Sequence, residues 1–182
     1  MIGALSPVKK LAIVVAIQAL ILLSIIGFKQ YTIWTGDTVL LKTIPVDPRD
    51  LLRGDFVRIQ YDISTVDLDK IAGDDQYSGT VYVELQRSDG GYWSAVALHG
   101  RRERSFDGTV LIKGHATHFG RGGGSRISVT YGIEQVFIPE GAGSSLPSGR
   151  GHVVAVEVKV DRFGNAVPRR FYVDGQPFDL SR

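Results

Sequence analysis

The chain has 182 residues, 43% of them apolar, and this composition suits one globular domain with an appendage. A formal net charge of +2 without a dense basic run excludes an extended nucleic-acid platform, so we expect no nucleic-acid partner. The sequence contains no cysteine, which excludes disulfides, thiolate catalysis and cysteine-ligated metals.

The first predicted element is an apolar run from Leu11 to Phe28, which follows Lys9 and Lys10 and carries no charge. Its length is close to the roughly 20 residues that a helix needs to cross a bilayer. A secretory signal peptide shares this pattern, but residues 24–27 lack the small-x-small sequence that precedes cleavage. The predicted organisation is therefore a cytoplasmic tail at 1–10, a transmembrane helix at 11–28, a linker at 29–37 and an exported domain at 38–182.

The charges that flank the apolar run predict its orientation. Lys9, Lys10 and the terminal amine precede the run, whereas Lys29 is the nearest cation after it. Basic residues favour the cytoplasmic side, so we expect a cytoplasmic N-terminus and an exported C-terminal domain. In a bacterium this means an inner-membrane anchor and a periplasmic domain.

The predicted anchor also carries a possible contact surface. Ala12, Ala16, Ala19 and Leu23 fall on one stripe at helical spacing, which permits close approach of a second helix. Gln18 points elsewhere, and a lone amide in lipid prefers a hydrogen-bond partner on another helix. A simple tether with tolerated alanines is the alternative interpretation.

From Thr38 onward the hydrophobic pattern has a period of two, which is typical of strands. Turn signals occur at residues 88–91, 162–165 and 174–175, where Asp, Asn and Gly favour tight turns. The acidic segment 67–77 has room for one helical turn, and residues 120–125 and 140–151 read as loops. The predicted fold is mainly β, an antiparallel sandwich or partly open barrel. Its strands are expected near residues 57–63, 81–86, 92–99, 109–119, 127–131, 136–138, 153–160 and 167–173.

One strand carries a recognisable motif, Gly54-Asp55-Phe56-Val57-Arg58-Ile59-Gln60-Tyr61. Together with segments 45–50, 131–141 and 172–175, it resembles the GDYXXLXY family of bacterial membrane-anchored proteins. Phe56 replaces the motif tyrosine and Ile59 replaces the motif leucine. The resemblance implies one N-terminal membrane segment, an exported β-rich domain and an association with multi-spanning membrane proteins. It implies no cofactor and no reaction.

The segment before this strand predicts a charged corner. Pro48 sets up a turn and Gly54 permits a tightly approached backbone. Arg49 and Arg53 can pair with neighbouring carboxylates, so the corner either fixes strand register or binds a partner. The candidate partner-binding residues are Asp47, Arg49, Asp50, Arg53, Gly54, Asp55 and Tyr61 at the corner, with Ala12, Ala16 and Gln18 in the helix.

These patterns favour a non-catalytic accessory subunit of a larger inner-membrane complex, with the bilayer and multi-spanning proteins as partners. A degenerate signal-peptidase-like hydrolase is the first alternative, because an Arg-Gly-Asp step precedes a strand soon after an anchor. Serine-lysine catalysis needs a serine near the membrane end, and residues 31–48 contain none. A periplasmic ligand-sensing domain is the second alternative. His115 and His118 lie three apart on an expected strand, where they face opposite sides, so we expect no metal site.

Overall fold

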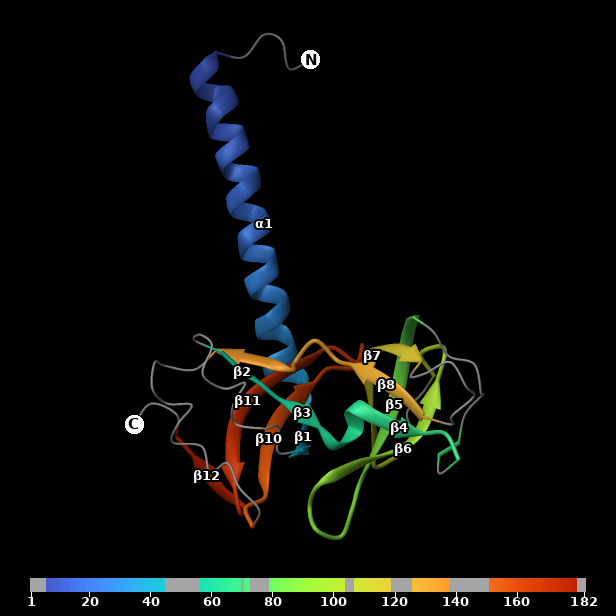
Figure 1. Cartoon of the computed structure of the whole chain (residues 1–182). Coiled ribbons are helices and arrows are strands. Elements are labelled where there is room, and N and C mark those ends of the chain that lie inside the picture. The colour runs from blue at the N-terminus through green and yellow to red at the C-terminus, as the bar shows by residue number, and fades with distance from the viewer. Residues whose placement is uncertain are drawn as a thin grey trace.

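A long helix projects from a β-domain (Figure 1). The computed structural model describes residues 6–44, 56–69, 71–72, 79–103, 107–118, 126–137 and 151–179. Within these residues the protein is mostly β, with two antiparallel five-stranded sheets after one apolar N-terminal helix, α1 (Pro7–Thr35). The mainly β, antiparallel fold expected from the sequence is therefore confirmed.

The first sheet has the strand order β12-β11-β10-β1-β3, and the second has the order β4-β8-β7-β5-β6. A separate two-stranded pair, β2-β9, accompanies them. The elements are β1 (Asp37–Ile44), β2 (Phe56–Arg58), β3 (Gln60–Tyr61), the 3-10 turn η2 (Asp62–Ser64), β4 (Thr65–Asp67), β5 (Gly79–Arg87), β6 (Trp93–His99), β7 (Thr109–His118), β8 (Arg126–Thr130), β9 (Gln135–Phe137), β10 (Val154–Val160), β11 (Ala166–Val173) and β12 (Gln176–Phe178).

The turns lie where the Asp-Gly and Gly-Asn signals predict them. In the β5–β6 hairpin the Ser88 amide donates to the Tyr92 carbonyl at 2.8 Å. Asp174 and Gly175 both have positive φ, 49° and 80°, between β11 and β12. The helical turn described in the β-domain is η2, which precedes the acidic segment 67–77 that was expected to hold one. Residue 70 and residues 73–77 of that segment lie outside the described residues.

The core lies between the two sheets and consists mainly of branched aliphatic side chains. Alternate residues of each central strand point inward, as the period of two predicts. Each fully buried Val, Leu or Ile contributes about 1.5–3 kcal/mol relative to an exposed one. The first sheet supplies Val39, Leu41, Val156 and Val158, and the second supplies Val81, Val83, Leu85, Ile112 and Val129, all at most 1% exposed.

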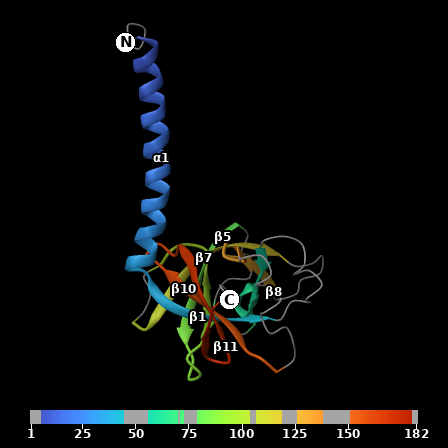
Figure 2. The ribbon, with the colours of Figure 1, turned by 90° about the vertical axis from the view of Figure 1, so that its left-hand side faces the viewer.

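The helix continues past its apolar run and enters the domain without a linker. Residues 29–35, which we assigned to a linker, are helical, and Gly36 alone separates α1 from β1. The physical reason is that no glycine or proline interrupts residues 28–35, so nothing ends the helix earlier. The helix is long and apolar enough to cross a membrane, and its apolar side chains are exposed. Figure 2 shows the helix joining the domain at one side, so most of the domain extends away from the helix axis.

Candidate functional site

The candidate residues from the sequence fall into three groups. Asp47, Arg49, Asp50, Arg53, Gly54 and Asp55 lie outside the described residues. Ala12, Ala16 and Gln18 are exposed on α1. Tyr61 is 0% exposed, so its side chain belongs to the core and offers no surface to a partner.

The motif strand forms the passage between the two sheets. Its first part, β2, pairs with β9; its second part, β3, pairs with β1; and after η2 the chain joins the second sheet as β4, beside β8. Residues 126–137 run antiparallel to it, through β8 and then β9. Between β2 and β3, the Ile59 amide donates to the Glu134 carbonyl at 2.7 Å. We call these two facing segments, 56–67 and 126–137, the crossover.

Two buried tyrosines, one in each segment of the crossover, form hydrogen bonds to the backbone of the opposite segment. The Tyr61 hydroxyl donates to the Ile133 carbonyl at 2.9 Å, and the Tyr131 hydroxyl donates to the Ile63 carbonyl at 2.7 Å. Each tyrosine therefore binds the backbone two residues beyond the other. A one-residue slip of either segment would break both bonds, so the pair fixes the register of the crossover.

Glu134 lies beside both tyrosines. One of its carboxylate oxygens accepts a hydrogen bond from the Tyr131 amide. Burial raises the pKa of both phenols far above the ordinary value, and the Glu134 charge raises each pKa further. Both hydroxyls therefore stay protonated and act as hydrogen-bond donors, which suits a structural role and not proton transfer.

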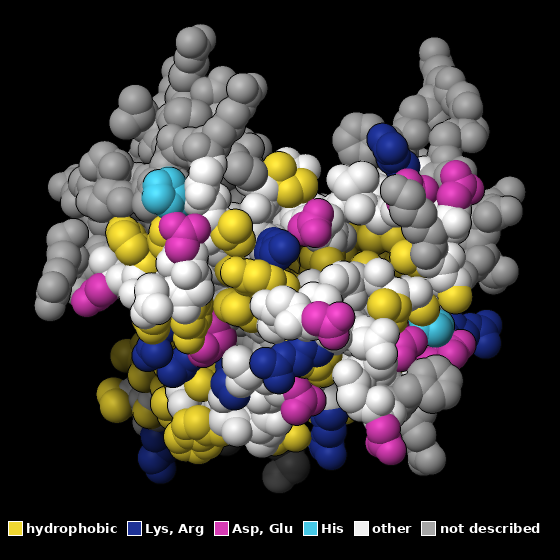
Figure 3. All heavy atoms as spheres, turned by 90° about the horizontal axis from the view of Figure 1, so that it is seen from below, with side chains coloured by type: hydrophobic (Ala, Val, Ile, Leu, Met, Phe, Trp, Pro, Cys, Tyr) yellow, Lys and Arg dark blue, Asp and Glu magenta, His cyan; other side chains and the backbone are white. Residues whose placement is uncertain are grey.

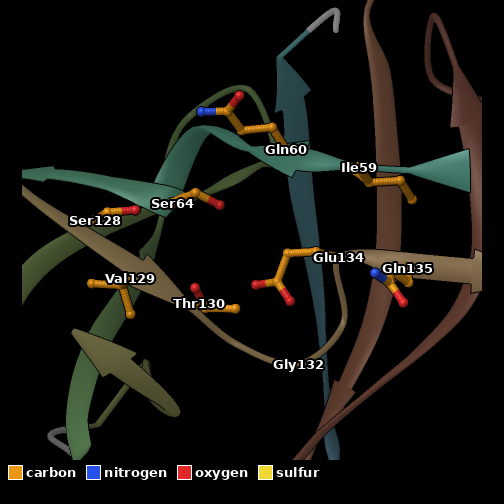
Figure 4. A pocket seen from close by; sticks show the side chains of 9 residues that line it. All are labelled: Ile59, Gln60, Ser64, Ser128, Val129, Thr130, Gly132, Glu134 and Gln135. Atoms are coloured by element: carbon orange, nitrogen blue, oxygen red, sulfur yellow. The ribbon is translucent and has the colours of Figure 1, made fainter. Parts of the chain in front are cut away.

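A pocket opens within the crossover, lined by residues of both its segments (Figure 4), and has a volume of about 470 Å³. Its side chains supply hydroxyls, amides and one carboxylate. The Ser64 hydroxyl in its wall already accepts a hydrogen bond from the Tyr61 amide at 3.2 Å. Such a lining can bind a small polar molecule through hydrogen bonds. The residues are Ile59, Gln60, Ser64, Ser128, Val129, Thr130, Gly132, Glu134 and Gln135.

The second notable region is the junction between α1 and the domain, which we define as Thr32, Gly36, Lys159 and residues 161–165. Thr32 is 1% exposed and its hydroxyl donates to Asp161 at 2.7 Å. Asp161 is 3% exposed and also accepts bonds from the Phe163 amide at 2.8 Å and the Asn165 amide at 3.0 Å. Burial by itself raises the pKa of Asp161, but the hydrogen bonds from Thr32, Asn165 and the two amides outweigh it and lower the pKa. A charged, fully bonded Asp161 thus fastens the helix to the β10–β11 turn.

Close backbone approach completes the junction. A Cβ on Gly36 would lie 2.5 Å from the Thr32 carbonyl oxygen and 3.0 Å from the Val160 backbone. Only glycine fits there without a shift of the backbone. The Lys159 ammonium donates to the Gly36 carbonyl at 3.2 Å and to the Thr38 hydroxyl at 2.7 Å. The turn also reaches the second sheet, because the Lys113 amide donates to the Gly164 carbonyl at 2.9 Å.

Two aromatic side chains stay exposed near this junction. Trp34 is 79% exposed on the last turn of α1. Phe163 is 40% exposed on the β10–β11 turn, with the guanidinium groups of Arg162 and Arg102 at 4.8 and 5.5 Å from its ring centre. Exposed tryptophan and an arginine-flanked aromatic ring are typical of membrane interfaces and protein contacts. At the opposite end of the domain, the described part of the face mixes hydrophobic side chains with Lys, Arg, Asp and Glu (Figure 3).

The two histidines considered for a metal site both lie on β7. His115 is exposed, and the side chain of His118 lies outside the described residues. In the part of the chain that the structure describes, no group of three His, Asp or Glu side chains could hold a metal ion.

Sequence reasoning missed most of the residues that organise these two regions. Tyr131 and Glu134 lie in a segment that carried the family resemblance. The local pattern that could have pointed to them was a tyrosine followed by a glycine at the end of a strand. Thr32 and Asp161 are 129 residues apart, so no local pattern could link them. A single Asp directly after a buried strand and before a Gly-Asn turn was the available hint.

An apolar helix long enough to cross a membrane, followed directly by an antiparallel β-domain, defines the class: within the described residues this is a β-protein with one N-terminal candidate transmembrane helix. The family model described as GDYXXLXY protein matches residues 18–171, which is most of the chain. The protein belongs to the GDYXXLXY family. Comparisons with curated proteins and with solved structures gave no match.

Proposed function

We propose that the protein is a non-catalytic, single-pass accessory subunit that binds and stabilises a larger complex of multi-spanning inner-membrane proteins. The proposed orientation is a cytoplasmic N-terminus and a periplasmic β-domain, on the basis of Lys9 and Lys10. The observation that carries the proposal is the junction, in which Thr32 and Asp161 hold the domain against the helix without a linker.

A rigid junction favours binding at a fixed height and angle. A domain held in place loses little orientational freedom when it meets a membrane partner, so less of the binding free energy is consumed in ordering. A flexible linker would suit a domain that searches for distant partners. The domain also extends to one side of the helix axis, which leaves it room to cover the outer face of a neighbouring protein (Figure 2).

The anchor helix supports the same proposal. Ala12 and Ala16 are exposed on one stripe, where their small side chains allow another helix to approach. The Gln18 side chain is exposed and has no hydrogen-bond partner among the described residues. In lipid, its amide gains a partner only from another polypeptide or from water.

Mild-detergent extraction tests the subunit role. The tagged full-length protein should co-purify with a multi-spanning membrane protein in a fixed ratio. Ala12→Leu with Ala16→Leu should reduce this recovery at least severalfold, because the larger side chains block close helix approach. Val14→Phe, on another face of the helix, is the matched control and should not. Purification of the wild-type protein alone under every mild condition would contradict the proposal.

A ligand-sensing role is the second candidate, and the pocket of about 470 Å³ within the crossover, with its hydroxyl, amide and carboxylate groups, favours it. A ligand bound there should raise the melting temperature of the protein in a thermal-shift screen of small polar metabolites. Gln135→Ala, at the exposed rim, should weaken any such shift. A screen in which no compound raises the melting temperature would reject this role.

A further inference from the structure

A second hollow, of about 610 Å³, lies beside the anchor helix. Lys29 of α1 lines it together with residues of β5, β7, β8 and the β10–β11 turn. It therefore lies on the side of the domain from which the helix leaves toward the membrane (Figure 1). Its lining comprises Lys29, Thr80, Lys113, Gly114, His115, Thr130, Tyr131, Gly132, Gly164, Asn165 and Ala166.

The floor of this hollow is a row of polar side chains across three strands. Thr80 of β5 is opposite His115 of β7, and His115 is opposite Thr130 of β8. Lys113 precedes His115 by two residues, so its side chain lies on the same face of the sheet. These four side chains are all exposed, so they present an ammonium, an imidazole and two hydroxyls to a bound group.

The charge of the hollow selects an anion. Lys29 and Lys113 are both exposed, and neither forms an ion pair with the described residues. Among the described lining residues there is no Asp or Glu. Two unneutralised ammonium groups with neighbouring hydroxyl donors match the oxygen-rich, negatively charged surface of a phosphate group.

The position of Lys29 along the helix sets the depth of the hollow in the membrane. Lys29 directly follows the apolar run Leu11–Phe28, which spans about 27 Å at the rise of an α-helix, close to the ~30 Å hydrocarbon core. Lys29 therefore lies where hydrocarbon gives way to headgroups. Phospholipid phosphates lie at that level, whereas a soluble anion has no reason to concentrate there.

The adjacent turn gives an independent indication. Phe163 directly precedes Gly164 of the hollow, and the guanidinium groups of Arg162 and Arg102 lie over its exposed ring. Its turn contacts α1 at Thr32, three residues beyond Lys29 and so about 5 Å further along the helix axis. An aromatic ring and guanidinium groups at this depth suit the boundary between headgroups and acyl chains.

The geometry points to a binding site for the phosphate group of a membrane phospholipid in this hollow, with Lys29 and Lys113 as its main ligands. The lipid would occupy the space between the helix and the overhanging domain. The hollow shares Thr130, Tyr131 and Gly132 with the crossover, but its two lysines lie outside the crossover. Lys29 is also separate from Ala12, Ala16 and Gln18 on the helix, so occupation of the hollow does not depend on the accessory role.

Native mass spectrometry of the full-length protein in mild detergent tests this site. Phosphatidylglycerol should remain bound, whereas diacylglycerol, which has the same chains without phosphate, should not. Lys29→Gln with Lys113→Gln should weaken phosphatidylglycerol binding about tenfold or more, because two charges near an anionic group are lost. Lys42→Gln, which removes a charge stacked on Tyr92, is the matched control and should bind normally.

Competition with inorganic phosphate separates a lipid from a free anion. Phosphate at millimolar concentration should not displace phosphatidylglycerol from the wild-type protein. Displacement at similar concentrations would overturn the assignment to a lipid. Equal binding of phosphatidylglycerol by the wild-type protein and by the folded double variant, with folding checked by near-UV circular dichroism, would overturn the site itself.

Discussion

The crossover and the junction both depend on buried hydrogen bonds between distant segments, but they serve different ends. At the crossover, Tyr61 and Tyr131 join two parts of the β-domain to each other. At the junction, Asp161 joins the β-domain to α1. The described end of the family motif therefore supports the fold of the domain, whereas the position of the domain relative to α1 depends on residues outside the motif. Breaking each region separately should therefore give separable effects on stability and on orientation.

The largest expected effect is at the crossover. Tyr61→Phe and Tyr131→Phe should each lower the free energy of unfolding by about 1–3 kcal/mol, because each leaves a buried carbonyl without its donor. The melting temperature should fall by about 2–4 °C per kcal/mol. Thermal unfolding of the full-length protein followed by circular dichroism measures both.

A matched control and a double variant sharpen this test. Tyr82→Phe removes a hydroxyl with no hydrogen-bond partner among the described residues and should change stability by less than about 0.5 kcal/mol. The two crossover variants should combine non-additively, since they lock the same pair of segments. Stability unchanged in either single variant would contradict the structural role of the tyrosines.

A destabilisation of similar size is expected at the junction. Asp161→Ala removes the acceptor for Thr32, Phe163 and Asn165, and should cost about 2–3 kcal/mol. Unlike the tyrosine variants, it should also loosen the helix relative to the domain. Limited proteolysis near Thr35 should cleave Asp161→Ala faster than wild type, while Tyr61→Phe should be cleaved there at the wild-type rate under native conditions.

Gly36→Ala should give a smaller effect of about 1–2 kcal/mol, because its Cβ would meet backbone atoms that cannot easily move. Gly27→Ala is the control, since a Cβ at Gly27 meets nothing within 4 Å. Chemical unfolding in urea should separate the two variants. Equal midpoints would indicate that the close approach at Gly36 is not a constraint on the fold.

The smallest effect is in the pH dependence. The pKa of Asp161 is lower in the folded protein than its ordinary value of 3.8, so the unfolded chain binds the proton more tightly. The stability that this carboxylate contributes is therefore complete well above pH 3.8 and is lost as the pH falls through that value toward the folded-state pKa. Asp161→Asn should remove this part of the acid sensitivity. If the melting temperatures of the wild-type protein and of Asp161→Asn fall in parallel as the pH is lowered from 6 to 3, this contribution of Asp161 is contradicted.

The sequence was sufficient for the elements that local patterns encode. The apolar run predicts the helix. Alternation predicts that Ile59, Tyr61 and Ile63 lie on the inner face of one strand; all three are buried, although Ile63 lies in the turn η2 and not in a strand. The prediction of a linker at 29–37 was wrong. The end of an apolar run indicates where the surroundings of a helix change from apolar to polar, but it does not end the helix. The Thr32–Asp161 bond and the two tyrosine bonds were beyond sequence reasoning, because each depends on how sheets stack and not on spacing along the chain.

Whether helix and domain form one rigid unit can be tested directly by pulsed electron-electron double resonance on the protein in a nanodisc, which measures the distance between two spin labels. The chain has no cysteine, so labels introduced at the exposed positions Leu20 and Arg169 would be the only ones. If helix and domain form one rigid unit, the pair gives a single narrow distance distribution, which broadens when Asp161→Ala is added. A distribution already broad in the protein with an intact junction would contradict it.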